Sequence, residues 1–463
     1  MSKFEHLSSS DDLESALEPQ FNGIPRVAAD TCRGRIERIE FPVPAVEPAL
    51  IFPQESVFPR IYWRNKDGSV EITALGAADR IRCFNWADYG FLTARLGERI
   101  TSGEGNPRYY GGMRFDAGRK IADEWSDLGL CDFVLPRVEV IRRGERTRLA
   151  YNRSLDESQA FDRTALLVEL VRRGLAPLTQ ILGRVGSPRY FPALHSRDDI
   201  PDRQGWSESV RQALTLFESG TLEKIVLARR TQVTFEAALD PILLLKNVTS
   251  NMPNSYCFLF QPTPDVAFLG ASPECLYRRT GRTLETEAIA GTRPNGETYA
   301  QELLNSDKDR REHRIVVEAL GESLSTLCGD VEADAEPSLL TLPGCQHLYT
   351  AVRGALREQV SDVEILRALH PTPAVGGSPT EEALRRIAEL EPFDRGWYAG
   401  PIGWIGADEA EFAVGIRSGL VQGKSLFLYA GAGLVAGSTP EGEWEEVEGK
   451  MNLFWNALTA HDR

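Results

Sequence analysis

The spacing of apolar residues along the chain predicts a mixture of strands and helices. Residues 133–141 form a short apolar run of strand length, and residues 223–230 alternate with a period of two. Near the end of the chain the spacing becomes helical, with an apolar stripe formed by Trp444, Val447, Met451, Phe454 and Leu458. No unit of about 20 to 50 residues repeats. The pattern therefore predicts a mixed α/β or α+β fold.

The character of the sequence changes along the chain. Residues 1 to about 54 are weakly patterned and end in a proline-rich run, which predicts an extended lead-in. Residues 57–191 contain short apolar runs separated by glycine-rich turns, as expected of strands. After a polar stretch at 195–205, glycine, histidine, glutamate and arginine become clustered. We place a boundary near residue 205, between an N-terminal half (1–205) and a catalytic region (206–458).

Charge and cysteine content exclude several classes of protein. The 463 residues include 67 Asp and Glu against 52 Lys and Arg, a net charge of -15. Without a basic patch, this charge disfavours binding to nucleic acid or to anionic membranes. No apolar segment reaches the roughly 18 residues of a membrane span. Seven widely spaced cysteines without a CxxC pair argue against disulfides and zinc, so we expect reduced thiols and a cytoplasmic protein.

Lys224 is a candidate general base. The period of two in residues 223–230 puts it on the same strand face as Val226 and Ala228. Desolvation by such apolar neighbours lowers a lysine pKa, and the neutral amine can then accept a proton. The alternative is a lysine whose stem lies on the protein while its amine reaches water from the strand end.

Glu274 is a candidate general acid. A predicted strand at 265–270 runs into a turn of small residues that presents this carboxylate at a strand end. The alternative is an ordinary Ser-Pro-Glu turn. Further along, Gly291 permits close approach of the backbone, and Thr292 is placed to meet a carboxylate.

Two predicted helices offer carboxylates that suit Mg²⁺. Ser306 is a predicted N-cap, and Asp309 and Glu312 follow one turn apart. The second helix begins at Pro440, and beside its apolar stripe lie Glu443, Glu446 and Lys450. Hard oxygen ligands are those that Mg²⁺ prefers. The alternative is carboxylates that favour helix N-termini together with a surface ion pair between Glu446 and Lys450.

Residues 412–417 alternate strictly, which predicts a strand with Ala413, Gly415 and Arg417 on one face. Small residues leading to an arginine suit a pocket floor with a carboxylate contact, to which Tyr398 adds a hydroxyl. A glycine pattern at 431–437 imitates a dinucleotide-binding loop, but too little chain follows for the second strand of that motif. An oxidoreductase is therefore a disfavoured alternative.

Nine segments in a fixed order resemble the chorismate-utilising enzymes, which include the anthranilate, aminodeoxychorismate, salicylate and isochorismate synthases. The resemblance covers about residues 206–457. The segments are Lys-Ile-Val-Leu-Ala-Arg (224–229), Gly-Ala-Ser-Pro-Glu (270–274), Ala-Gly-Thr-Arg-Pro (290–294), Asp-Arg-Arg-Glu-His (309–313), His-Leu-Tyr-Thr (347–350), Leu-His-Pro-Thr-Pro-Ala (369–374), Tyr-Ala-Gly-Pro-Ile-Gly-Trp (398–404), Gly-Ile-Arg (415–417), and Ala-Gly-Ala-Gly (430–433) followed by Glu-Trp-Glu-Glu (443–446).

The resemblance implies a fold and a set of roles. The fold is α+β, with two stacked β-sheets between outer helix layers and the N-terminal half completing the same body. Lys224 would activate water for attack at ring carbon C2, and Glu274 would protonate the departing C4 hydroxyl. Mg²⁺ would be held by Glu312 and Glu446, supported by Asp309 and Glu443. Chorismate would be bound by Gly291, Thr292, His347, Ala374, Tyr398, Arg417, Gly431, Gly433 and Lys450.

Two residues point to one member of this family. A lysine at 224 favours water over ammonia as the nucleophile, and Ala374 matches isochorismate synthases where salicylate-forming relatives carry threonine. The resemblance thus implies a monomeric isomerase whose product enters menaquinone or siderophore biosynthesis. The segment 376–378 and Asn295 depart from the usual pattern without touching an assigned role. A salicylate synthase and a regulatory protein that only binds chorismate are the alternatives.

Overall fold

The computed structural model describes residues 36–43, 57–85, 95–100, 106–154, 190–250 and 252–459. The predicted lead-in lies outside these residues except for strand β1 (Ile36–Val43). Within the described residues, no helix combines the length and the apolar content needed to cross a membrane. The six cysteines among them form no disulfide bond with one another.

The strands form one hydrogen-bonded network in which every pairing is antiparallel. Its centre is the long strand β5 (Cys131–Arg143). One edge of β5 pairs with β3 (Val70–Cys83), and the other pairs with β4 (Tyr109–Met113) and then β6 (Arg146–Ser154), which pairs with β1. The network therefore divides at β5 into two arms.

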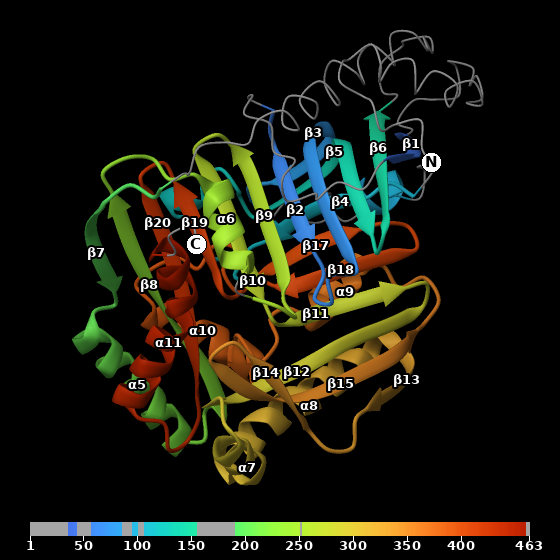
Figure 1. The fold of residues 1–463 in the computed structure, drawn as a ribbon. Helices are drawn as coiled ribbons and strands as arrows, with labels where there is room; N and C mark the ends of the chain where they lie inside the picture. The colour runs from blue at the N-terminus through green and yellow to red at the C-terminus, as the bar shows by residue number, and fades with distance from the viewer. Residues whose placement is uncertain are drawn as a thin grey trace.

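The first arm continues from β3 and includes most strands of the left and upper part of Figure 1. In order of pairing it contains β2 (Arg60–Arg64), β9 (Tyr256–Thr263), β10 (Val266–Ser272), β19 (Ser418–Gln422), β20 (Ser425–Leu434) and β8 (Lys224–Phe235), which pairs in turn with β7 (Leu194–Ile200) and β16 (Gly377–Ser378).

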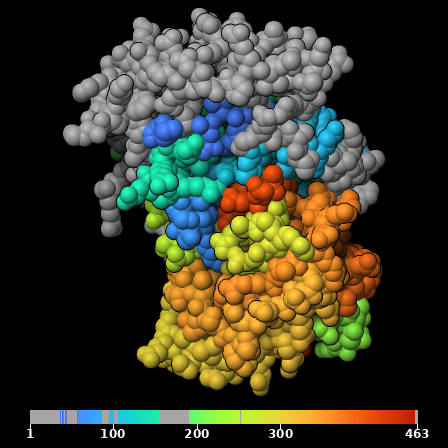
Figure 2. Space-filling view, turned by 90° about the vertical axis from the view of Figure 1, so that its right-hand side faces the viewer, coloured from blue at the N-terminus to red at the C-terminus, as the bar shows by residue number. Residues whose placement is uncertain are grey.

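The second arm continues from β4 and forms the lower right of Figure 1. It contains β17 (Pro401–Ile405), β18 (Glu409–Val414), β11 (Cys275–Thr280), β12 (Thr283–Pro294) and β15 (Cys345–Leu356), which pairs with β13 (Cys328–Ala333) and β14 (Ser338–Leu342). Figure 2 shows residues of the N-terminal half lying above this arm.

Helices pack on both arms. Those on the first arm are α5 (Arg203–Glu218), α6 (Pro241–Ser250), α10 (Thr380–Leu390) and α11 (Pro440–Thr459). Those on the second arm are α7 (Glu297–Asn305) and α8 (Asp307–Leu327), with α9 (Asp362–Leu369) packed on α8. A single turn of 3₁₀ helix (Asp123–Trp125) buries Trp125 in the core.

Aromatic side chains join the arms into one core. The ring of Trp397 lies 5.3 Å from that of Phe260 on β9 and 6.1 Å from that of Phe268 on β10. Phe133 on β5 contacts Phe412 on β18 with ring centroids 6.3 Å apart. Edge and tilted contacts of this kind add to the hydrophobic stabilisation that burial of large rings provides. The core is therefore continuous between the two arms.

These observations confirm the α+β class and change two details. The two sheets are joined, because β5 is long enough to pair with β3 on one edge and with two strands on the other. The dinucleotide-loop alternative is wrong, since Gly431 and Gly433 lie inside β20 and pair with β8.

The polar stretch at 195–205 is not only a linker. Its first part forms β7, an edge strand whose mostly exposed side chains explain its polar composition. Strands from both sides of residue 205 pair with one another, as β2 does with β9 and β4 with β17. The N-terminal half thus shares the sheet that carries the residues of the catalytic region.

Candidate active site

One pocket brings together the predicted chemistry. It encloses about 90 Å³ and is lined by every residue predicted for catalysis, substrate binding or direct metal binding. These residues are Lys224, Glu274, Gly291, Thr292, Glu312, His347, Ala374, Tyr398, Arg417, Gly431, Gly433, Glu446 and Lys450. Strands of both arms and helices α8 and α11 contribute to the lining. Asp309 and Glu443 lie outside it.

Lys224 begins β8, and its side chain is only 1% exposed. The buried position excludes a lysine that reaches water from the strand end. Its surroundings are not purely apolar, however, because its Nζ lies 3.0 Å from Glu312 Oε1 on α8. Gly433 makes room for this pair, since a Cβ there would lie 2.5 Å from Glu312 Oε1 and 3.3 Å from Lys224 Cε. Sequence spacing gave no sign of this contact between residues so far apart.

Glu274 lies in the short turn between β10 and β11, as predicted. The turn is held by its backbone: the Glu274 N–H donates to Ser272 Oγ at 3.2 Å, and the Val414 N–H donates to the Glu274 carbonyl oxygen at 3.1 Å. Burial raises the pKa of Glu274 to about 8, and the negative charge of Glu287 adds to the rise. The carboxyl group is therefore protonated at neutral pH and able to donate a proton.

The two helices begin where the sequence predicted. Ser306 caps α8 by accepting a hydrogen bond from the Asp309 N–H, and Pro440 is the first residue of α11. Glu446 and Lys450, one turn apart on α11, form an ion pair of 2.7 Å inside the pocket. Lys450 Nζ also donates to the Gly431 carbonyl oxygen at 2.7 Å. The pair therefore belongs to the pocket and not to the open surface.

The two supporting carboxylates contact basic residues behind the pocket. Asp309 is buried and pairs with Arg293 at 2.6 Å, and Glu443 is buried and lies 3.5 Å from Lys308. Burial raises the pKa of Glu443, and the charges of Glu446 and Glu312 raise it further. The acidic groups of α8 and α11 thus repel one another, and a bound divalent cation would offset this repulsion. Among the described residues, no group of three or more His, Cys, Asp or Glu side chains is placed to hold a metal ion.

His347 is held as a neutral ring. Burial lowers its pKa to about 3, and the positive charges of Arg417 and Lys450 lower it further. Its Nδ1 lies 3.2 Å from the Gly291 carbonyl oxygen and 3.1 Å from Thr292 Oγ1. Because a carbonyl only accepts, Nδ1 carries the hydrogen, and Nε2 is left as an acceptor 3.4 Å from the Cys345 thiol. Gly291 itself has a left-handed φ of +74°, and a Cβ there would lie 3.1 Å from the Asp309 Cβ, so glycine is favoured at this position.

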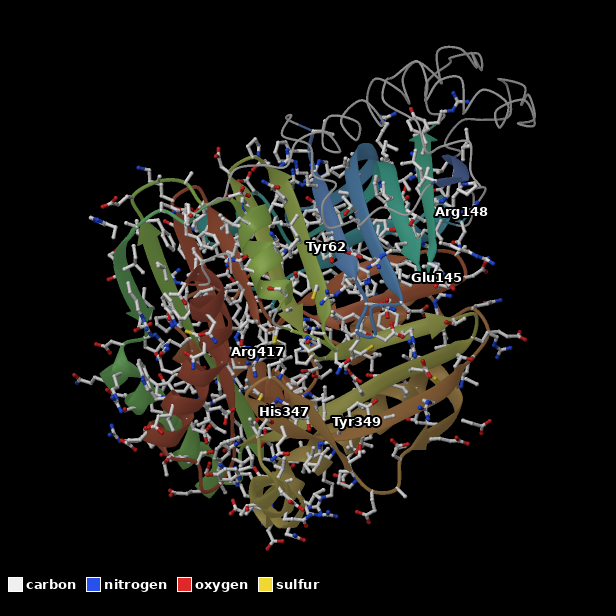
Figure 3. The ribbon with its side chains drawn as sticks, viewed as in Figure 1. Tyr62, Glu145, Arg148, His347, Tyr349 and Arg417 are labelled. Carbon is white, nitrogen blue, oxygen red and sulfur yellow. The ribbon has the colours of Figure 1, made fainter. Side chains whose placement is uncertain are left out.

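Arg417 reaches the pocket in a way that the sequence pattern did not predict. Strand β18 ends at Val414, and Arg417 lies in the turn before β19 with a left-handed φ of +49°. The predicted strand is therefore confirmed only as far as Val414, and the predicted floor of small residues is wrong because Ala413 and Gly415 do not line the pocket. Figure 3 shows Arg417 and His347 close together near the middle of the molecule.

Tyr398 is buried against the floor of the pocket. Its ring stacks on that of Tyr429 with centroids 5.4 Å apart, and burial raises the pKa of its hydroxyl. Gly431 leaves room for this hydroxyl, because a Cβ at position 431 would lie 3.2 Å from the Tyr398 hydroxyl oxygen. Tyr398 therefore offers a neutral hydroxyl donor to a ligand.

Sequence reasoning missed the apolar walls of the pocket. It also missed Arg395, whose hydrogen bonds hold the backbone of one wall. The missed lining residues are Val226, Pro273, Ile289, Ala290, Val375, Ile416, Tyr429 and Ala430. The period of two along β20, from Tyr429 to Gly433, is a signal that could have found Tyr429. Behind the wall, the buried Arg395 donates to Glu391, to the Val226 carbonyl oxygen at 2.7 Å and to the Val375 carbonyl oxygen at 2.9 Å.

The chain is similar to known proteins over most of its length. The family described as "Chorismate binding enzyme" matches residues 24–459. "Isochorismate synthase 2, chloroplastic" of Arabidopsis thaliana is 37% identical over 360 residues, which are 76% of this chain and 64% of that protein. "Isochorismate synthase MenF" of Escherichia coli is 31% identical over 455 residues, which are 95% of this chain and 97% of that protein. This chain spans less than two thirds of the plant relatives, whose covered shares are 64% and 62%.

Solved structures agree as well. The menaquinone-specific isochorismate synthase MenF from Escherichia coli superposes with a TM-score of 0.80 and 28% identity, covering 97% of this chain and all of that one. Anthranilate synthase component I from Streptococcus pneumoniae, at 20% identity and a TM-score of 0.67 over 98% of this chain and 99% of that one, has the same fold. Because the family match spans nearly the whole chain, this protein belongs to the chorismate binding enzyme family.

Proposed function

We propose that this protein is an isochorismate synthase that converts chorismate to isochorismate reversibly. The observation that carries the proposal is the presence, in one pocket, of a buried lysine and a buried carboxyl group, and burial raises the pKa of that carboxyl group to about 8. An exchange of a hydroxyl group between two ring carbons needs one group to accept a proton and one to donate it. The printed names of the relatives support the same reaction.

The two groups have complementary roles. Lys224 accepts a proton from water as the water oxygen bonds to C2 of the ring. The ring double bonds shift, the C4–oxygen bond breaks, and Glu274 donates its proton so that the C4 hydroxyl departs as water. Afterwards Lys224 releases its proton and Glu274 regains one. The reverse reaction exchanges the two roles, and general acid and base groups each contribute about 10² to 10⁴ in rate.

The remaining residues bind and orient the substrate. Arg417 and the Tyr398 hydroxyl are suited to the enolpyruvyl carboxylate, because a guanidinium binds a planar carboxylate with two hydrogen bonds. Neutral His347 lies beside the ring without adding charge. Ala374 leaves only a methyl group near the enolpyruvyl side, which favours isomerisation over loss of pyruvate.

We also propose that Mg²⁺ is the cofactor, held by Glu312 and Glu446. The carboxylates of α8 and α11 fit such an ion, because Mg²⁺ takes one or two carboxylates and keeps several waters. When bound, it would supply a counter-charge for the ring carboxylate of the substrate. Asp309 and Glu443 would support the two ligands from behind. Since one chain supplies every residue of the pocket, we further propose that the protein acts as a monomer. We also propose a cytoplasmic location, which suits the lack of disulfides among the six described cysteines.

One assay tests the proposal. Purified protein, chorismate and Mg²⁺ are incubated at neutral pH and the products are separated by chromatography, with lactate dehydrogenase and NADH added in parallel to report pyruvate. We expect a mixture of chorismate and isochorismate, approached from either side, without pyruvate and without stimulation by ammonium. Pyruvate in proportion to chorismate consumed would replace the proposal with a salicylate synthase. Anthranilate formed with ammonium would overturn the role of Lys224, and chorismate binding without turnover would indicate a regulatory protein.

A further inference from the structure

A second cavity, of about 490 Å³, is lined by residues of β11, β12 and β15 and of the turn between β2 and β3. Glu274 is the last residue of the turn between β10 and β11, and Cys275 is the first residue of β11. Glu274 lines the catalytic pocket, whereas Cys275 lines this second cavity, which we call the outer cavity. The two cavities therefore adjoin at the peptide bond between Glu274 and Cys275.

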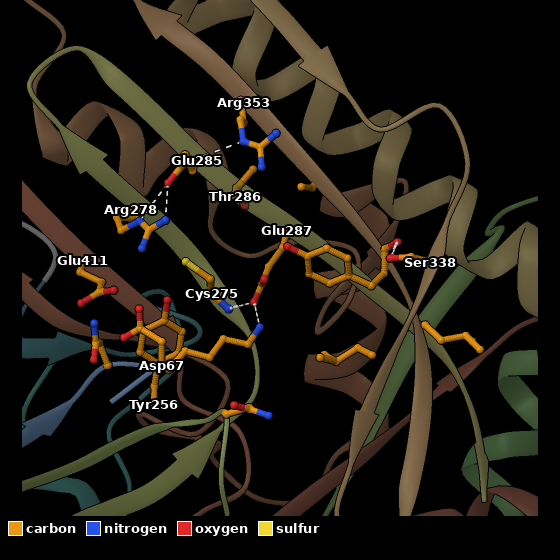
Figure 4. Close-up of a pocket in the computed structure, with 17 residues that line it drawn as sticks. Asp67, Tyr256, Cys275, Arg278, Glu285, Thr286, Glu287, Ser338, Arg353 and Glu411 are labelled. Carbon is orange, nitrogen blue, oxygen red and sulfur yellow. Dashed lines mark hydrogen bonds and ion pairs between the residues drawn. The ribbon is translucent and has the colours of Figure 1, made fainter. Parts of the chain in front are cut away.

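Glu287 connects the outer cavity to the turn that bears Glu274. It lies on β12 with its side chain 9% exposed, and its Oε1 accepts a hydrogen bond from the Cys275 N–H at 2.8 Å. The same oxygen pairs with Lys66 Nζ at 2.6 Å, from the turn between β2 and β3. Lys66 Nζ also lies 5.7 Å from the centre of the Tyr349 ring. Figure 4 shows Glu287 beside Cys275, with the dashed bond between them.

The charges of this pair reach the carboxyl group of Glu274. After burial, the negative charge of Glu287 is the main influence that raises the pKa of Glu274, and the positive charge of Lys66 acts in the opposite direction. The catalytic pocket brings other titratable or charged groups toward Glu274, and these are Lys224 on β8, Glu312 on α8, His347 on β15, Glu446 and Lys450 on α11, and Tyr398 and Arg417 in loops. None of them lies on the outer cavity.

We propose that Glu287 is a positioning residue for the acid Glu274, holding its turn through the Cys275 amide, and that Lys66 sets the strength of this influence by pairing with Glu287. The inference rests on the proposed function, because Glu274 is the acid of that reaction. It assigns a catalytic effect to two residues that touch neither substrate nor metal. It also makes the outer cavity a place from which charge alters the chemistry of the pocket.

The pH dependence of kcat/KM tests the proposal, because a general acid works only while protonated. In the unaltered protein the alkaline limb is expected near pH 8, the pKa of Glu274. Glu287→Gln removes a negative charge and should move this limb to lower pH by about one unit. Lys66→Met removes a positive charge and should move it to higher pH. Glu287→Asp, which keeps the charge, should leave the limb nearer its original place.

Glu285→Gln is the matched control. Glu285 lies two residues before Glu287 on the same strand and lines the same cavity, but it pairs with Arg278 and Arg353. It is not among the charges with the largest influence on Glu274, so the alkaline limb in this variant should move less than in Glu287→Gln. If Glu287→Gln lowered kcat or thermal stability while the alkaline limb stayed in place, Glu287 would be only structural and the inference would be wrong.

A second readout separates this inference from the proposed function. The carboxyl stretch of Glu274, identified by its loss in Glu274→Gln, can be followed by infrared difference titration without turnover. Glu287→Gln should lower the titration midpoint and Lys66→Met should raise it, whatever product the protein forms. Shifted midpoints in a protein that makes no isochorismate would overturn the proposed function alone. Unshifted midpoints in an active isochorismate synthase would overturn the inference alone.

Discussion

The catalytic pocket has one wall of strands and one wall of helices, and the two walls treat a glutamate side chain in opposite ways. On the strand wall, burial and Glu287 raise the pKa of Glu274 to about 8. On the helix wall, burial also raises the pKa of Glu446, but the charge and hydrogen bond of Lys450 more than offset it, and the pKa falls below its usual value. The same side chain is therefore protonated at neutral pH on one wall and anionic on the other.

Backbone geometry explains this difference. On a helix, residues four apart are neighbours, so Lys450 meets Glu446 at 2.7 Å. Glu274 lies in a turn at a strand end, and the next residue, Cys275, faces the outer cavity. No residue of this turn is basic. A direct ion pair with a cation thus decides whether a buried carboxyl group is ionised or protonated at neutral pH.

Loss of the acid on the strand wall should have the largest effect. Glu274→Gln keeps the shape of the side chain but cannot donate a proton as an acid, so turnover should fall by about 10² to 10⁴. Binding of chorismate and of Mg²⁺, measured by calorimetry, should change little because the helix wall is intact. Near-normal turnover in Glu274→Gln would show that Glu274 is not the acid, and the proposed difference between the two walls would be wrong.

Loss of an anion on the helix wall should have a smaller effect of another kind. Glu446→Gln replaces a hard anionic ligand with a neutral amide, so the Mg²⁺ concentration for half-saturation should rise by about 10-fold or more. Direct titration of Mg²⁺ measures this apart from turnover. Glu445→Gln, an exposed neighbour on the same helix, is the control and should have no effect. An unchanged titration in Glu446→Gln would return this glutamate to a structural ion pair.

The smallest effect should come from a substitution at Gly433, where a strand of the pocket contacts Glu312 on helix α8. In Gly433→Ala the new methyl group would lie 2.5 Å from Glu312 Oε1 and 3.3 Å from Lys224 Cε, which must move the end of the glutamate side chain. Because that end is flexible, we expect a several-fold loss of kcat with little change in the free energy of unfolding. Gly321→Ala on α8, which has open space around it, is the control. Equal rates in both variants would contradict the tight contact between the walls.

Local structure was predictable from the sequence where neighbouring residues decide it. Ser306 and Pro440 begin their helices because a cap and a fixed φ act within one turn. Strand β8 and the turn at Glu274 were likewise evident from alternation and small residues. The prediction failed at Arg417, where the strand ends early and a left-handed residue redirects the side chain. Alternation in a sequence cannot report where sheet pairing stops.

By itself, the sequence determined the α+β class and the start of each site-bearing helix. Through an ordered set of segments it also determined the candidate catalytic and binding residues of the pocket, but not its apolar walls. Only the tertiary structure decided how these residues act on one another. Lys224 on a strand pairs with Glu312 on a helix. The charges of Glu287 and Lys66 change the pKa of Glu274, and Glu287 accepts a hydrogen bond from the next residue's amide. Such contacts join residues that are distant in the chain. Because burial and charge act over a few ångströms of space, no spacing along the sequence records them.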